Sequence, residues 1–323
     1  MQKRIQNKVA ESRYALPVTT AYAIAIWLAG GELLPSVPFT SDGLFRGAWV
    51  QFVCFLVSAY LMVELNNSNA LIRIYSRMVS CSFLVICCAA CFLFSSMDGA
   101  IAQLCFIAAY FMFFRSYQDK TAVGWIFYTF LFIGLGSIAK VHLLYFVPIL
   151  WISMFIHLTA LSWRTFAASL IGLLTPYWFA LPFVLYNNAV EQAINHFSAL
   201  LEFQLPFNLK ILSANQLIFM VFVIALAITG IIHYERKRIN DNIRIRLLYS
   251  FFITMDLATI AFLLLQPQHY DLLIRLLIVN TAPLIAHFIS LTHTRITDIA
   301  FLVICSVALI ITLLNLWMPS LTF

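Results

Sequence analysis

Charged residues are scarce in this 323-residue chain. With 19 Lys and Arg and 13 Asp and Glu, 10% of its residues are charged, whereas a soluble domain has about 25%. So few charges cannot solvate the surface of a 36.8 kDa globule, which excludes a soluble enzyme, a nucleic-acid-binding protein and a disordered chain. The abundant component is apolar: 63% of the residues are hydrophobic and the mean hydropathy is +0.94. The composition predicts an all-α, polytopic transmembrane bundle whose main partner is the lipid bilayer.

Motifs for metals and nucleotides are also missing. The sequence has neither an HExxH spacing nor a Gly-rich phosphate loop, so we expect no metal site and no cofactor, and the need for a divalent cation stays open. The seven cysteines all lie in apolar runs, and the pair Cys88 and Cys91 has no polar neighbour. Because thiolate chemistry requires a polar setting, we interpret the cysteines as packing residues.

Long apolar runs cover most of the chain. A helix needs about 20 apolar residues to cross the hydrocarbon core. We predict eleven spans in a single integral membrane domain over residues 1–323, which begins with a short cytoplasmic tail, 1–14. A count of ten or twelve stays open. The predicted spans are 15–34, 44–63, 78–97, 100–114, 122–139, 141–161, 166–186, 211–232, 247–265, 272–291 and 299–318.

The basic residues predict an orientation. With eleven spans, 15 of the 19 Lys and Arg fall on the same side as the N-terminus. Basic residues accumulate in cytoplasmic loops, so we expect the N-terminus in the cytoplasm and the C-terminus outside. The same rule accounts for the sequence pI of about 9.0 without an acidic partner.

The longest external segment, 187–210, has an amphipathic pattern. Val190, Ile194, Phe197 and Leu201 recur at helical spacing, with polar residues between them. This pattern predicts an external helix that lies in the interface plane and ends before Pro206. His196 on this helix is a weaker candidate for ligand contact.

Ionisable residues gather where the external ends of the predicted spans fall. Acids and bases from many spans occur together on the external side, which favours a substrate site there. The alternative is that these charged side chains only mark the span ends and extend into the aqueous phase. The residues are Glu32, Asp42, Arg46, Asp98, Lys140, His142, His269, Asp271 and Arg275.

Asp256 is different because it lies in the middle of a predicted span. Its burial requires a partner or protonation, and a proton relay, a substrate contact and a structural hydrogen bond all remain open. Asn280 and Pro283 indicate a kink in the following span. His287 falls near a cytoplasmic span end, and we expect it at the interface.

Three stretches in order resemble elements of the GT-C glycosyltransferases. The branch is the one that includes protein mannosyltransferases and the lipid A aminoarabinose transferase, and the likeness covers roughly residues 125–290. The stretches are Ile133-Gly-Leu-Gly-Ser-Ile-Ala-Lys140 continuing to Pro148, Leu170-Ile-Gly-Leu-Leu-Thr-Pro-Tyr-Trp-Phe-Ala-Leu-Pro182, and Gln266-Pro-Gln-His-Tyr270 followed by an apolar span to Pro283. The chain also resembles small polytopic proteins of bacterial inner membranes, from which no activity carries over.

The GT-C resemblance implies transfer of a sugar from a polyprenyl-phosphate carrier to an acceptor at the external face of the inner membrane. Asp42 would match the first acid of the family's catalytic motif, while Gly43 stands where that motif has its second acid. Lys140 would match the family lysine, and His269 with Tyr270 the late motif.

Chemistry adds further roles at this site. Asp42 or Glu32 would accept the proton of the acceptor. Arg46, Lys140 or Arg275 would hold the phosphate leaving group, and His142 belongs to the same substrate-binding set.

Two other functions fit the sequence. A non-catalytic subunit or assembly partner of an envelope complex would bind another membrane protein. A transporter or lipid flippase would use Asp256, Asn280 and Pro283 within the spans.

Overall fold

The computed structural model describes residues 4–33, 42–204 and 206–317, with side chains for 4–30, 48–204 and 206–317. Within these ranges the chain is helical and contains no strand. The α-helices are α1 (Ile5–Ala10), α2 (Ala15–Leu33), α3 (Asp42–Asn69), α4 (Met78–Ala89), α5 (Met97–Phe113), α6 (Val123–Ala139), α7 (Val147–Ile156), α8 (Trp163–Tyr186), α9 (Val190–Ser198), α10 (Ala214–Lys237), α11 (Ile243–Leu265), α12 (Tyr270–Leu291) and α13 (Arg295–Trp317).

Short 3-10 turns, named η, connect or extend several helices. The ones used below are η1 (Cys91–Ser95), η3 (Val141–Phe146), η4 (Ala199–Leu201) and η7 (Pro267–His269). The backbone at Lys140 is extended (φ −139°, ψ 98°). The chain therefore reverses direction between α6 and η3, as the sequence predicts.

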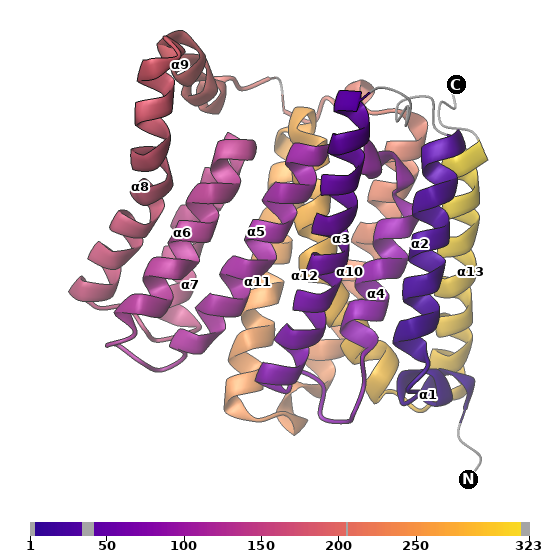
Figure 1. Cartoon of the computed structure of the whole chain (residues 1–323). Coiled ribbons are helices and arrows are strands. Elements are labelled where there is room, and N and C mark those ends of the chain that lie inside the picture. The colour runs from indigo at the N-terminus through magenta and orange to yellow at the C-terminus, as the bar shows by residue number, and fades with distance from the viewer. Residues whose placement is uncertain (1–3, 34–41, 205, 318–323) are drawn as a thin grey trace.

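Each of the eleven predicted spans overlaps an α-helix, some of which are extended by a 3-10 turn (Figure 1). Within the described residues, seven helices are long and apolar enough to cross a bilayer. The shorter apolar helices are Ala15–Gly30, Met78–Ala89, Val123–Ala139 and Val141–Ile156. The helical bundle is therefore confirmed, while the count of eleven spans and the orientation stay predictions.

α12 is the central helix. It packs against α4, α5, α10 and α11, and its most apolar 18-residue window is entirely buried. Gly230 of α10 permits one of these contacts, since a Cβ there would lie 2.8 Å from Cβ of Leu284. Polar residues at both ends of α12 consequently meet side chains from several helices.

α6 and α8 form a flank on one side of the bundle (Figure 1). A Cβ on Gly134 would lie 2.7 Å from the carbonyl oxygen of Leu173, and one on Gly136 would lie 2.7 Å from Leu143. Close helix approach at these two glycines, which their sequence context predicts, is therefore confirmed. α9 follows α8 and lies across the end of this flank (Figure 1).

Candidate functional site

Three charged side chains meet where α12 begins, and we call them the rim cluster: Lys140, Asp271 and Arg275. Asp271 lies in the first turn of α12. Its carboxylate is 3.6 Å from Nζ of Lys140 and 3.2 Å from Nε of Arg275. The hydroxyl of Ser96 donates a further hydrogen bond to Asp271, at 3.0 Å. Two cations thus share one carboxylate.

Arg275 is fixed from several sides. Its side chain is 3% exposed, one helical turn after Asp271, the spacing at which helix side chains meet. Besides Asp271, its guanidinium donates to the carbonyl oxygens of Leu93 and Ser96 and, at 3.3 Å, to the side-chain oxygen of Gln103. A buried cation needs such compensation. Arg275 therefore ties α12 to η1 and α5.

Lys140 is held less tightly. Its side chain is 33% exposed and that of Asp271 is 34% exposed. An ion pair with this exposure contributes about 0–1 kcal/mol. An incoming anion can thus replace Asp271 as the partner of Lys140 at small cost.

Two histidines stack next to this cluster. The rings of His142 in η3 and His269 in η7 have their centroids 3.6 Å apart. A ring nitrogen of His142 lies 3.2 Å from the carbonyl oxygen of Ala199 in η4, and Gln268 bonds His269 at 3.0 Å. The pair brings together segments more than a hundred residues apart.

The segment after α8 covers this end of the flank. His196 of α9 lies 3.0 Å from the carbonyl oxygen of Ser137. The Tyr145 hydroxyl donates to the carbonyl oxygen of Leu200 at 2.8 Å. The amphipathic helix predicted within 187–210 is thus present as α9 and continues into η4. Its position in the interface plane of a membrane stays a prediction.

The structure brings together five of the rim residues predicted from sequence: Lys140, Asp271 and Arg275 as one cluster, and His142 with His269 as a pair. Tyr270 points elsewhere, because its hydroxyl donates to the carbonyl oxygen of Gln216 in α10 at 2.9 Å.

Three predicted residues lie outside the part of the chain whose side chains are described: Glu32, Asp42 and Arg46. In backbone terms, Glu32 is in the last turn of α2 and Asp42 opens α3. Their predicted roles are therefore untested.

Sequence reasoning missed two partners of this cluster, Ser96 and Gln103. Ser96 is the N-cap of α5, where its side chain accepts a hydrogen bond from the amide of Gly99. A serine just before an apolar helix that has an acid in its first turn is a recognisable N-cap signal. The sequence could therefore have identified Ser96 as the N-cap of α5. Gln103 has no such signal.

Asp256 lies in the middle part of α11 and is 0% exposed. The hydroxyl of Thr281 in α12 donates to it, 3.1 Å from Oδ1. Nearby, Asn280 accepts a hydrogen bond from Tyr110 of α5 at 2.8 Å. Of the three readings of Asp256, the structural hydrogen bond to a neighbouring helix has a direct geometric basis.

A second charged group lies at the other end of α12, and we call it the buried cluster: Arg73, Asp241 and His287. Asp241 is 3.0 Å from Nε of Arg73 and 3.2 Å from Nε2 of His287. The side chains of Asp241 and His287 are 1% and 0% exposed, whereas that of Arg73 is 40% exposed. His287 is therefore buried between helices and held by Asp241, while its expected position at the membrane interface stays a prediction.

Among the described residues, no three His, Cys, Asp or Glu side chains gather closely enough to hold a metal ion. Comparison with protein-family models, curated proteins and solved structures gave no match. The composition and the fold together define a multi-pass helical membrane protein.

Proposed function

We propose that the rim cluster binds the phosphate of a polyprenyl-phosphate-linked sugar, and that the chain transfers this sugar to an acceptor at the external face of the bacterial inner membrane. The observation that supports this most is the charge balance: Lys140 and Arg275 share the single carboxylate of Asp271. The cluster therefore has an excess positive charge at a partly exposed position.

The two cations suit different parts of such a reaction. Arg275 is already placed by four acceptors and would keep its position when a ligand arrives. Lys140, at a 3.6 Å separation from Asp271, can turn to a phosphate oxygen. Fixed positive charge stabilises a phosphate leaving group as its charge develops. His142 and His269 would contact the sugar or phosphate beside Lys140.

A lipid-linked substrate also needs a surface for its tail. α8 presents exposed aromatic side chains at Trp178, Phe179 and Phe183. It is joined to the site region because the hydroxyl of Tyr177 lies 2.6 Å from that of Ser137. A polyprenyl chain lying along α8 would leave its phosphate near the rim cluster.

The acceptor's proton would go to Asp42, with Glu32 as the alternative base. α3, which Asp42 opens, packs against α5, and Ser96 caps α5. This role rests on the GT-C resemblance.

Lys140→Gln tests the proposal, with Lys210→Gln as the matched control. Lys210 is an exposed lysine on the same external side of the predicted topology, in the segment 187–210. Native mass spectrometry of the purified full chain would measure binding of a polyprenyl phosphate. Loss of a charge-assisted hydrogen bond predicts about tenfold weaker binding for Lys140→Gln and no change for Lys210→Gln. Asp42→Asn should leave binding intact and abolish sugar transfer in membranes.

A non-catalytic role is the second candidate, because the contacts of Asp271 join α5, the α6–η3 reversal and α12. In that case, Lys140→Gln and Lys210→Gln would bind the polyprenyl phosphate equally, Asp42→Asn would change nothing, and a second membrane protein would copurify in stoichiometric amount.

A further inference from the structure

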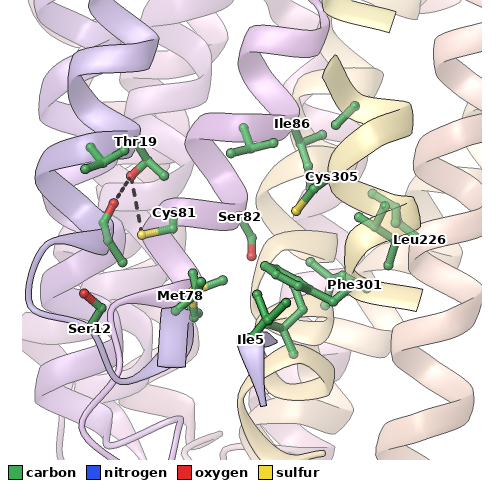
Figure 2. Close-up of a pocket in the computed structure, with 18 of the residues that line it drawn as sticks. Ile5, Ser12, Thr19, Met78, Cys81, Ser82, Ile86, Leu226, Phe301 and Cys305 are labelled. Carbon is green, nitrogen blue, oxygen red and sulfur yellow. Dashed lines mark hydrogen bonds between the residues drawn. The ribbon is translucent and has the colours of Figure 1, made fainter. Parts of the chain in front are cut away.

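A separate apolar cavity of about 430 Å³ lies between α1, α2, α4, α10, α12 and α13 (Figure 2). This volume lies within the range of ligand pockets, about 300–1,000 Å³. Its walls are almost entirely apolar and include Ile86, Phe222, Leu226, Ile285 and Phe301. It lies toward the end of α12 opposite the rim cluster: from Asp271 to Ile285 the helix rises by about 21 Å. The cavity is therefore distinct from the proposed transfer site.

One polar atom in this cavity lacks a partner. Ser82 of α4 is 7% exposed, and its hydroxyl has no hydrogen-bond partner in the structure. Figure 2 shows this hydroxyl directed into the space between α4 and Phe301. Thr19 of α2, which lies beside Cys81 of α4, is satisfied, since its hydroxyl donates to the carbonyl oxygen of Ala15 at 2.9 Å. A buried, unsatisfied hydroxyl is costly, so Ser82 indicates a ligand with a hydrogen-bond acceptor.

The charged residue that lines this cavity is Lys8 of α1, an exposed side chain. Along α4, Met78, Ser82 and Ile86 line the cavity at successive turns, about 6 Å apart. The lining thus offers a cation at the α1 end, then a hydroxyl donor, then an apolar wall. An anionic phospholipid has the same order of groups: phosphate, ester carbonyl and acyl chain.

We propose that this cavity binds one acyl chain of an anionic phospholipid from the leaflet at the α1 end. The phosphate lies near Lys8, an ester carbonyl accepts the hydrogen bond of Ser82, and the acyl chain packs against Ile86 and Phe222. The surrounding solvent of a membrane bundle is lipid, and a polar group within it must find a partner. The lipid joins the N-terminal α1 to the helices that enclose the cavity.

Photo-crosslinking tests this proposal on the purified full chain. The probes are phosphatidylglycerol and phosphatidylcholine that carry the same photoreactive acyl chain, and mass spectrometry maps the adducts. We expect adducts on cavity residues such as Ile86 and Phe222. Cys305→Trp fills the cavity and should reduce these adducts at least fivefold. The matched control is Leu309→Trp, on the same helix but 50% exposed, and should leave them unchanged.

Two milder variants test the polar contacts. Lys8→Gln should weaken phosphatidylglycerol binding about fivefold and leave phosphatidylcholine unchanged. Ser82→Ala should weaken both lipids about two- to tenfold and fold normally, because it removes an unsatisfied hydroxyl. Adducts spread evenly over exposed positions such as Ile310, or unchanged labelling in both Ser82→Ala and Cys305→Trp, would overturn the proposal.

Discussion

The two ends of α12 carry charged clusters of the same makeup, one aspartate between two basic side chains, in opposite surroundings. In the rim cluster, Asp271 is 34% exposed and Lys140 is 33% exposed. In the buried cluster, Asp241 is 1% exposed and His287 is 0% exposed, and only Arg73, at 40%, reaches the surface. The exposure of the carboxylate decides what each cluster can do. A carboxylate in contact with water can give up a partner to a ligand, whereas a buried carboxylate such as Asp241 depends on the partners it has. The rim cluster therefore suits binding, and the buried cluster suits structure.

Arg73→Gln should have the largest effect, because it leaves the carboxylate of Asp241 buried without its cation. Arg73 lies 3.0 Å from Asp241 and also donates to the carbonyl oxygen of Asn240 at 2.9 Å. The Arg73 side chain is 40% exposed and that of Asp241 is 1% exposed. Leaving this buried carboxylate without its half-exposed partner lowers the free energy of unfolding by about 3 kcal/mol. Denaturation in mixed micelles would measure the change.

Arg238→Gln is the control for that experiment. Arg238 pairs with Glu235 at 2.9 Å, with both side chains nearly half exposed, and the loss of such a pair costs less than about 1 kcal/mol. Equal stability of the Arg73 and Arg238 variants would end the distinction between buried and exposed clusters.

The sequence predicts the fold of this chain better than its sites. Apolar runs and breaks such as the one at Lys140 locate the helices, because lipid demands long apolar segments with satisfied backbones. The pairing of Lys140 with Asp271, or of His142 with His269, depends on which helices become neighbours, and periodicity carries no such information. The burial of His287 could not be predicted for the same reason: its position near a span end does not show which helices pack around it.

Gly99→Ala should have an intermediate effect on the free energy of unfolding, because the added methyl group would press against the rim cluster. A Cβ at Gly99 would lie 2.6 Å from Nε of Arg275 and 2.6 Å from Oδ2 of Asp271, closer than van der Waals contact allows. Overpacking of this kind costs about 1–3 kcal/mol. If the proposed function holds, polyprenyl phosphate binding should fall as well.

Gly124→Ala is the matched control, because a Cβ there meets nothing within 4 Å. Alanine is the better helix former, so stability should stay the same or rise by up to about 1 kcal/mol. Were Gly99→Ala as stable and as active in binding as Gly124→Ala, the rim cluster would not depend on its observed geometry.

Asp256→Asn should have the smallest effect on the free energy of unfolding. It extends the comparison to a buried acid whose partner is a hydroxyl group and not a cation. Asparagine keeps an oxygen that accepts the hydrogen bond from Thr281, which is 3.1 Å long in the structure. The free energy of unfolding should therefore change by less than about 1 kcal/mol. Asp256→Leu removes that acceptor and should lose a little more, since hydrogen bonds between membrane helices average about 0.6 kcal/mol. The same micelle denaturation would rank the two variants. A stable Asp256→Asn protein with an altered, pH-dependent flux of a solute or lipid would instead assign this acid to transport, because a structural hydrogen bond has no reason to couple to flux.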